Sequence, residues 1–329
     1  MSSHRHSDDP SSSLAVRVTA FFFGVLLKVL RFTPWKLRRA ISRQIGNYAA
    51  RRHMNRQMAA RANLDLAFGN SKSFEEKERI ALESFRNFAG CMVDAVSMIP
   101  SLTKDNWTRY VRVPEEDLIR TREYLARGKG VILMFSHYGN WELMGACLPF
   151  MDLRQVHVVA KRQSPWANPF LERFRSGTGN KVVYKEGAIR KCLSALKRGE
   201  LVGFAIDQNF SQGVFVPFFG VEAGTSDTLA ALARTSGAAI VPLVCTPNGD
   251  GTYSGRLMPE VETKTTDDKQ ADIHDITRRC LAHLEGIIRE RPELWLWSHK
   301  RWKSRPPHEE PKRDIYSSPL KSERAGDAP

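Results

Sequence analysis

Four short runs of almost uninterrupted apolar residues constrain the fold of this chain most strongly. They cover residues 131–135, 156–160, 201–206 and 239–244. Stretches with helical character, such as residues 188–197 and 228–235, alternate with them. A strand that is apolar along its whole length must be buried on both faces, which is typical of parallel sheets covered by helices. The pattern therefore predicts an α/β fold with a mostly parallel central sheet flanked by helices.

The rest of the chain divides around this region. Residues 1–13 are polar and rich in serine, which predicts a disordered tail. Residues 14–60 join an apolar run to basic helices, and residues 61–305 form the expected α/β domain, with further helices before residue 110. Gly69 and Asn70 predict the end of one helix, and Ser73 with Glu76 predicts a capped start of the next. The proline-rich, charged residues 306–329 predict a flexible tail.

The chain is strongly basic, with a formal net charge of +14 and a pI near 9.7. Such a charge predicts an anionic partner, which could be nucleic acid, an anionic membrane surface, or an acidic protein or substrate. The basic residues gather near the start, because no Asp or Glu occurs from Pro10 to Leu64. Only the charge supports a nucleic-acid-binding protein, since the sequence has no recognised motif of that kind, and we expect no nucleic-acid partner.

An apolar run, residues 18–27, lies inside this basic region and continues beyond Lys28 to Phe32. It is shorter than the roughly 20 residues that a helix needs to cross a bilayer. No small-residue cleavage site of a signal peptide follows it. We expect a helical membrane anchor that lies on the membrane or spans it marginally. Because the positive charges lie on its C-terminal side, the rest of the chain would stay cytoplasmic if the segment inserts. The alternative is an amphipathic helix packed on the core.

The cysteines are widely scattered and form neither a CxxC pair nor a zinc-binding pattern with histidine. They predict reduced thiols in a protein core, and we expect no disulfide scaffold and no metal site. The five positions are Cys91, Cys147, Cys192, Cys245 and Cys280.

A histidine and a glutamate follow the first apolar run, at His137 and Glu142. Positions five apart on one helix point about 140° away from each other. The two side chains can therefore meet only if His137 lies in a turn and Glu142 in the first turn of a helix. A neutral histidine is suited to accept a proton near neutral pH, and a carboxylate on its other ring nitrogen would orient it. The pair predicts a catalytic base with an orienting carboxylate, the alternative being a capping histidine and a surface glutamate.

Polar residues also end two other apolar runs. Arg162 follows the second run and could hold an anionic phosphate through charge-assisted hydrogen bonds, and Arg175 is a weaker candidate of the same kind. Asp207 and Gln208 follow the third run, where parallel α/β folds place their sites, and could organise Arg162 or a substrate headgroup. The alternatives are a solvated loop charge for Arg162 and an ordinary turn for Asp207 and Gln208.

The run His137-Tyr138-Gly139-Asn140-Trp141-Glu142 resembles the H-x4-D/E signature of the lysophospholipid acyltransferase superfamily. In its glutamate form it is similar to the late (lauroyl/myristoyl) acyltransferase family of lipid A biosynthesis. Further blocks resemble that family in the same order, so the likeness extends over about residues 15–306. These blocks are residues 61–68 with 84–88, residues 207–220, residues 231–242 and residues 292–303.

This resemblance implies an acyltransferase (EC 2.3.1.-) of lipopolysaccharide biosynthesis on the cytoplasmic face of the inner membrane. It would move a fatty acyl chain from an acyl carrier protein thioester to a hydroxyl of a lipid A precursor, without a cofactor beyond the donor. His137 would deprotonate that hydroxyl, Glu142 would orient His137, and no acyl-enzyme would form. The resemblance also places Arg162 and Asn168 at the substrate. A serine hydrolase is disfavoured because no G-x-S-x-G elbow is present.

The acceptor and the donor remain open at this point. Proteins with the same motifs acylate other glycolipids, so the alternative is an acyltransferase that acts on another glycolipid or a phospholipid with acyl-CoA as donor. The aromatic block 214–219 and the tryptophans near residues 295–302 could line an acyl channel or simply form core.

Overall fold

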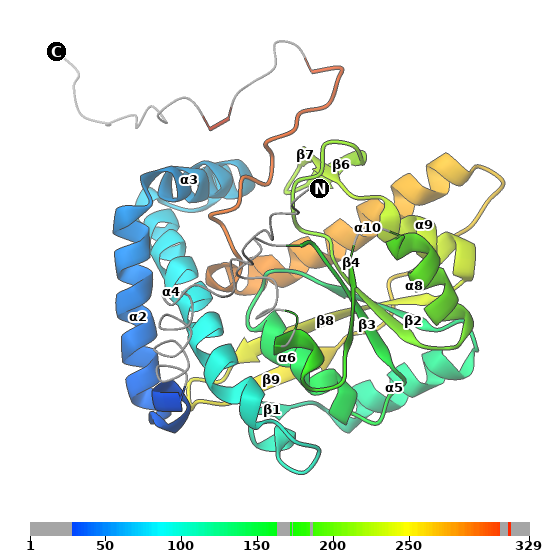
Figure 1. The fold of residues 1–329 in the computed structure, drawn as a ribbon. Helices are drawn as coiled ribbons and strands as arrows, with labels where there is room; N and C mark the ends of the chain where they lie inside the picture. Colours follow the sequence, from blue (N-terminus) through cyan, green and yellow to red (C-terminus); the bar gives the residue numbers. More distant parts are fainter. Residues whose placement is uncertain (1–27, 163–171, 173, 185–186, 310–314, 317–329) are drawn as a thin grey trace, which may run out of the picture.

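The computed structural model describes residues 28–162, 172, 174–184, 187–309 and 315–316. Within them, a seven-stranded sheet has the order β1-β9-β8-β2-β5-β3-β4 (Figure 1). Neighbouring strands run parallel except for β8 and β9, so the predicted, mostly parallel sheet is confirmed. The strands are β1 (Val111–Arg112), β2 (Val131–Phe135), β3 (Val156–Ala160), β4 (Lys181–Tyr184), β5 (Leu201–Ala205), β8 (Ala239–Pro247) and β9 (Tyr253–Leu257). A separate antiparallel ribbon joins β6 (Val214–Phe218) to β7 (Val221–Thr225).

Helices cover both faces of the sheet, as predicted. They are α2 (Trp35–Arg52), α3 (Met54–Phe68), α4 (Phe74–Met98), α5 (Glu115–Ala126), α6 (Trp141–Cys147), α8 (Ala188–Lys197), α9 (Thr228–Ser236) and α10 (Lys269–Glu290). Alternate residues of β2 enter different cores, because successive side chains of a strand point to opposite faces. Ile132 and Met134 pack in the cluster that includes α8, α9 and α10, whereas Val131 and Leu133 pack in the cluster that includes α5 and α6.

The N-terminal helices α2, α3 and α4 stand beside the sheet (Figure 1). The predicted helix boundaries are confirmed: α3 ends at Phe68, before Gly69, and a reciprocal capping box of Ser73 and Glu76 starts α4. Helices α2 and α4 approach closely at Gly46, where a Cβ would lie 2.6 Å from the Cα of Arg86. This glycine therefore sets the distance between the two helix backbones.

The expected membrane anchor lies mostly outside the described residues. The apolar run 18–27 and the tail 1–13 lie outside the described residues. In the described ranges no helix is long and apolar enough to cross a bilayer. Large apolar side chains on and before α2 are nevertheless exposed, namely Val29, Phe32, Leu37, Ile45 and Tyr48.

Tyr316, which lies beyond the predicted tail boundary at residue 306, contacts the core. The Tyr316 hydroxyl donates to the side-chain oxygen of Asn63 at 2.6 Å and accepts from the backbone N–H of Trp302 at 3.0 Å. Residues 310–314 and 317–329 of the predicted tail lie outside the described residues.

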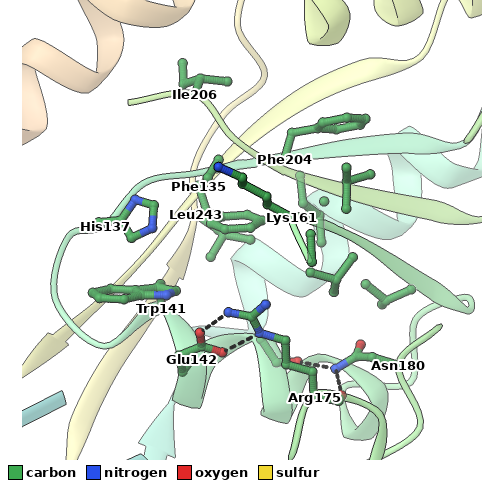
Figure 2. A pocket seen from close by; sticks show the side chains of 18 of the residues that line it. Phe135, His137, Trp141, Glu142, Lys161, Arg175, Asn180, Phe204, Ile206 and Leu243 are labelled. Atoms are coloured by element: carbon green, nitrogen blue, oxygen red, sulfur yellow. Dashed lines mark hydrogen bonds and ion pairs between the residues drawn. The ribbon is translucent and has the colours of Figure 1, made fainter. Parts of the chain in front are cut away.

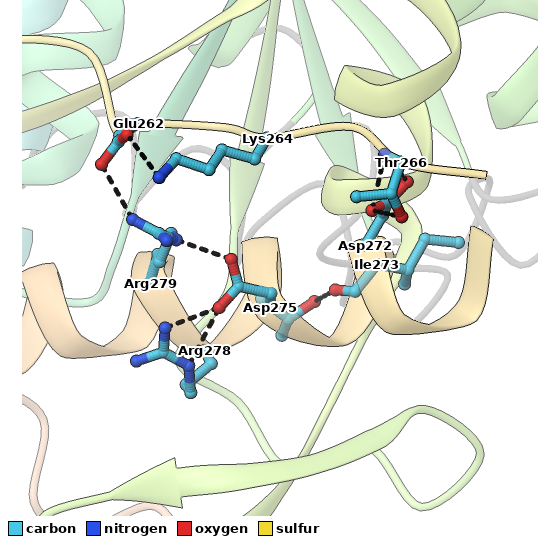
Figure 3. Close-up of polar contacts among 9 residues, drawn as sticks. Glu262, Lys264, Thr266, Asp272, Ile273, Asp275, Arg278 and Arg279 are labelled. Carbon is cyan, nitrogen blue, oxygen red and sulfur yellow. Dashed lines mark hydrogen bonds and ion pairs between the residues drawn. The ribbon is translucent and has the colours of Figure 1, made fainter. Parts of the chain in front are cut away.

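A network of ion pairs and hydrogen bonds fastens the loop before α10 to that helix (Figure 3). Arg279 bridges Asp275 and Glu262, at 2.6 and 2.9 Å. Oδ2 of Asp272 accepts both the backbone N–H of Thr266 at 2.9 Å and the guanidinium of Arg234 on α9 at 2.7 Å. The loop thereby joins α9 to α10 on one side of the sheet.

Replacement of Gly46 by Ala should destabilise the protein even though alanine favours helices. The added methyl meets the backbone of α4, so the helices must move apart, at a cost of about 1–3 kcal/mol. Gly286→Ala is the matched control, because Gly286 is exposed on α10 with open space at its Cβ and should gain about 0.5–1 kcal/mol. Urea unfolding measures both, and equal stabilisation by the two changes would contradict the close approach.

Candidate active site

The turn between β2 and α6 holds His137. Strand β2 ends at Phe135 and α6 begins at Trp141, so His137 lies in the turn and Glu142 in the first helical turn, as predicted. Gly139 has φ +58°, and a Cβ there would overlap the carbonyl oxygen of Cys245 on β8. No residue with a side chain fits this position, so the turn depends on glycine.

Backbone hydrogen bonds from two distant segments hold the turn in place. The Gly139 N–H donates to the carbonyl of Leu294 at 3.0 Å, and the N–H of Leu296 donates to the carbonyl of His137 at 3.0 Å. The Asn140 N–H donates to the carbonyl of Cys245 at 2.7 Å, and the Asn140 side chain caps α6. Because the backbone on both sides of His137 is hydrogen-bonded, the position from which the imidazole extends is fixed.

The orienting carboxylate for His137 is Asp207, which follows β5. The Nδ1 atom of His137 lies 2.9 Å from Oδ1 of Asp207, and the backbone N–H of His137 donates to Oδ2 at 2.7 Å. The indole N–H of Trp295 also donates to Oδ2, at 2.9 Å. The register explains this partner: β2 and β5 pair with Phe135 opposite Ala205, and two residues further along each strand stand His137 and Asp207.

This contact sets the tautomer of the imidazole. An ionised carboxylate only accepts hydrogen bonds, so Nδ1 carries the proton and Nε2 has a free lone pair. The amide nitrogen of Gln208 lies 3.3 Å from Nε2, a long contact that an incoming hydroxyl could replace. His137 is thus arranged to accept a proton at Nε2.

The electrostatics agree with that arrangement. Burial lowers the pKa of His137, but the charge and hydrogen bond of Asp207, with a smaller contribution from Glu142, outweigh burial and hold the pKa above its ordinary value. Burial raises the pKa of Asp207, whereas its bonds to His137 and Trp295 lower it more strongly, so Asp207 stays ionised. An ionised carboxylate in this position would stabilise the imidazolium if Nε2 took a proton.

Glu142 does not contact the His137 ring, and the predicted partnership of these two residues is therefore wrong. Its carboxylate forms a two-pronged ion pair with Arg175, whose Nε lies 3.1 Å from Oε2. The reason is the direction of α6: Glu142 faces the segment before β4, while Nδ1 of His137 faces β5. Figure 2 shows Glu142 and Arg175 joined on the wall of a cavity, with Trp141 between them and His137.

That cavity has a volume of about 560 Å³ and reaches from His137 along the sheet beneath α6. Its walls are mainly apolar, whereas His137, Glu142, Arg175 and Gln208 supply polar atoms (Figure 2). The Trp141 ring meets His137 edge to face, with centroids 4.9 Å apart. The apolar lining includes Ile99, Leu133, Phe135, Gly145, Ala146, Leu148, Val156, Val158, Gly203 and Leu243.

The other predicted site residues have mixed positions. Lys161 lines the cavity, whereas its neighbour Arg162 does not. The guanidinium of Arg162 lies instead over the ring of Tyr184, 4.1 Å from its centroid. Asp207 contacts His137 and not Arg162, contrary to one predicted role. Asn168 lies outside the described residues.

Sequence reasoning missed two contributors. Trp295 belongs to an aromatic block that composition assigns to core or channel, yet its indole N–H holds Asp207. Trp141 stands inside the signature itself and packs on the His137 ring. Neither role has a local signal, because each depends on a partner that is brought near by folding. Within the described part of the chain, no group of His, Cys, Asp and Glu side chains converges as metal ligands, and all five cysteines are buried with free thiols.

Comparison with known proteins supports the sequence resemblance. The family model described as bacterial lipid A biosynthesis acyltransferase matches residues 6–304. The lipid A biosynthesis palmitoleoyltransferase of Escherichia coli (strain K12) is 30% identical over 301 residues, which cover 88% of this chain and 92% of that protein. The lauroyltransferase of the same organism is 27% identical, over 86% and 90% of the two chains. The phosphatidylinositol mannoside acyltransferase of Mycolicibacterium smegmatis is 27% identical over 54% of this chain and 58% of its own.

Replacement of Asp207 by Asn should lower the pKa of His137. The carboxylate is the main influence that raises this pKa, so its loss leaves the opposing effect of burial. The titration of ¹⁵N-labelled histidines by NMR measures the change.

Glu200→Gln is the matched control, because Glu200 accepts from Nε2 of His157 at 2.8 Å in a similar pair elsewhere. It should leave the titration of His137 unmoved. A His137 pKa that stays the same in Asp207→Asn would contradict the role of Asp207.

Proposed function

Because the chain belongs to the bacterial lipid A biosynthesis acyltransferase family, and is thus an acyltransferase, we propose that it acylates a hydroxyl group of a lipid A precursor. The donor in this proposal is an acyl chain on an acyl carrier protein thioester. One observation carries the proposal most directly: Nε2 of His137, set as an acceptor by Asp207, opens onto a largely apolar cavity.

In the proposed reaction His137 acts as the general base. Nε2 takes the proton of the acceptor hydroxyl as its oxygen attacks the thioester carbon. The tetrahedral intermediate then collapses, the C–S bond breaks, and the imidazolium returns the proton to the leaving thiolate. An oxygen ester and a free thiol result, and the histidine is restored. Asp207 stabilises the imidazolium between these steps and remains ionised throughout.

Arg175 supplies positive charge in the same cavity. Its ion pair with Glu142 holds the guanidinium on the cavity wall, and burial lowers its pKa less than the bond to Glu142 raises it, so it stays charged. We assign it to the thioester oxygen, where negative charge grows in the transition state. Glu142 then acts by positioning Arg175.

Direct transfer without an acyl-enzyme is supported by the state of the cysteines. Burial raises the pKa of Cys147 and Cys280 to about 12, so their thiols stay protonated and poorly nucleophilic. Ser136, next to His137 in the chain, is buried as well, because only 4% of its surface is exposed.

The apolar part of the cavity suits an acyl chain. It lies between α6 and strands β2, β3 and β5, where small residues leave room: Gly145 and Ala146 on α6, and Gly203 on β5. The acyl chain would extend away from His137 beneath α6, with the thioester at the polar end. The length of this space would set the length of the chain that the enzyme prefers.

The acceptor is proposed from the relatives, and a second glycolipid remains a candidate. The similarity to a phosphatidylinositol mannoside acyltransferase over about half of each chain favours a mannosylated inositol lipid as that second candidate. Action on the cytoplasmic face of the inner membrane is part of the proposal, because the exposed apolar residues of α2 are flanked by Lys36, Arg39 and Arg51, as in interfacial helices.

Replacement of His137 by Ala should lower the transfer rate by about 10²–10⁴-fold, the usual contribution of a general base. Membranes that contain the full-length protein are incubated with acyl carrier protein thioesters and either a lipid A precursor or a mannosylated inositol lipid, and the products are identified by mass. A variant that transfers at the wild-type rate would refute the mechanism. If only the mannosylated inositol lipid were acylated, that lipid and not a lipid A precursor would be the acceptor.

Replacement of Gly145 by Leu should shorten the preferred acyl chain. The space at its Cβ is open and belongs to the cavity, so the new side chain occupies volume that long chains need. The ratio of kcat/KM for shorter over longer donors should rise by about tenfold or more for each excluded methylene. Gly286→Leu, the same change at an exposed position of α10, should leave chain preference unchanged. An unaltered preference in Gly145→Leu would place the acyl chain elsewhere.

A further inference from the structure

We propose that helix α8 carries the docking surface for the acidic carrier protein that delivers the acyl thioester. This inference rests on the proposed function, in which the donor is such a carrier. The surface, called the α8 face, consists of Lys181, Arg190, Lys191, Ser194, Lys197 and Arg198.

The α8 face is a concentration of positive charge. From Gly187 to Gly199 the chain holds four Lys or Arg residues and no Asp or Glu. These cations are exposed because the buried side of α8 is formed by Ala188, Cys192, Ala195 and Leu196. Arg198 is paired with Glu200 at 2.7 Å. Lys181, Arg190, Lys191 and Lys197 form no ion pair with any residue that the structure describes.

The α8 face has a groove that a partner could occupy with one of its own helices. A shallow groove of about 660 Å³ runs between α8 and β4, the edge strand of the sheet. Lys181 stands on the strand side of this groove, and Arg190, Lys191 and Arg198 stand on the helix side. Among the described residues that line the groove, these four cations outnumber one carboxylate, Glu172. An acidic helix laid along the groove would meet cations from both walls, which favours complementary charge pairing.

The α8 face lies next to the cavity that contains His137. Ala188 and Ile189, in the first turn of α8, line the cavity that contains His137. Ile189 is 55% exposed, so the same turn belongs to the cavity wall and to the outer surface. A carrier bound along α8 would therefore present its thioester arm at the entrance of the cavity. Arg190 and Lys191 follow Ile189 directly and begin the basic surface there.

The composition of the face favours a protein over a membrane. Helix α2, which we assign to the membrane, exposes several large apolar side chains among its cations. The α8 face exposes cations with Ile189 as the large apolar neighbour. The two helices lie on opposite sides of the molecule in Figure 1, α2 at the left and α8 at the right. A water-soluble carrier could reach α8 while α2 rests on lipid.

The test is the double charge reversal Arg190→Glu with Lys191→Glu in the full-length protein. KM for the acyl carrier protein thioester should rise about tenfold or more, with kcat nearly unchanged, because exposed charges govern encounter and docking. KM for acyl-pantetheine, the same thioester arm without a protein, should stay at the wild-type value. Binding of the unacylated carrier, followed by fluorescence anisotropy, should weaken by the same factor and lose most of its dependence on salt.

The matched control is Lys104→Glu with Arg109→Glu, an equal change of charge at exposed residues between α4 and β1. It should leave both donors and carrier binding unaffected. Equal effects of the two double variants, or an equal loss with acyl-pantetheine, would overturn the docking surface. A loss of binding to anionic phospholipid vesicles, with carrier binding intact, would overturn it in favour of a membrane contact. If the wild-type protein transferred acyl chains from no thioester, the proposed function itself would fail, which is a distinct result.

Discussion

A single buried carboxylate, Asp207, joins three distant segments of this protein around His137. Asp207 is 2% exposed, and a buried negative charge is costly unless it is compensated by hydrogen bonds and an opposite charge. Its donors come from the turn after β2, through the backbone and ring of His137, and from the C-terminal block, through Trp295. Because Asp207 itself follows β5, three distant segments must be in place together.

Much of the fold could be predicted from the sequence, because its signals are local. Apolar runs indicate buried strands, Ser73 and Gly69 mark helix ends, and the spacing of His137 and Glu142 places one in a turn and the other on a helix. The partner of His137 could not be predicted in the same way. It depends on the order of strands in the sheet, and β5 lies beside β2 although two other strands of the sheet, β3 and β4, come between them in the chain.

Glu142 illustrates the same limit. Its short distance from His137 in sequence suggests a pair, but a helix sends its second residue in a direction set by the turn before it. In the structure that direction leads to Arg175, which is 33 residues away in the chain. The distribution of basic residues along the chain predicted the charged surfaces better than sequence spacing predicted individual ion pairs. The exposed cations form two surfaces: one on α2, where they mix with several large apolar residues, and one on α8, where Ile189 is the large apolar neighbour.

The contact of Trp295 with Asp207 also has a consequence for biosynthesis. A ribosome makes the chain from the N-terminus, so β2, β5 and most of the cavity wall are synthesised well before residue 295. Until the C-terminal block emerges, Asp207 lacks its indole donor, and the turn lacks the backbone bonds to Leu294 and Leu296. The histidine therefore acquires its final orientation only when nearly all of the protein has been translated. A truncated or nascent chain would therefore hold most of the cavity wall but lack the contacts that orient His137.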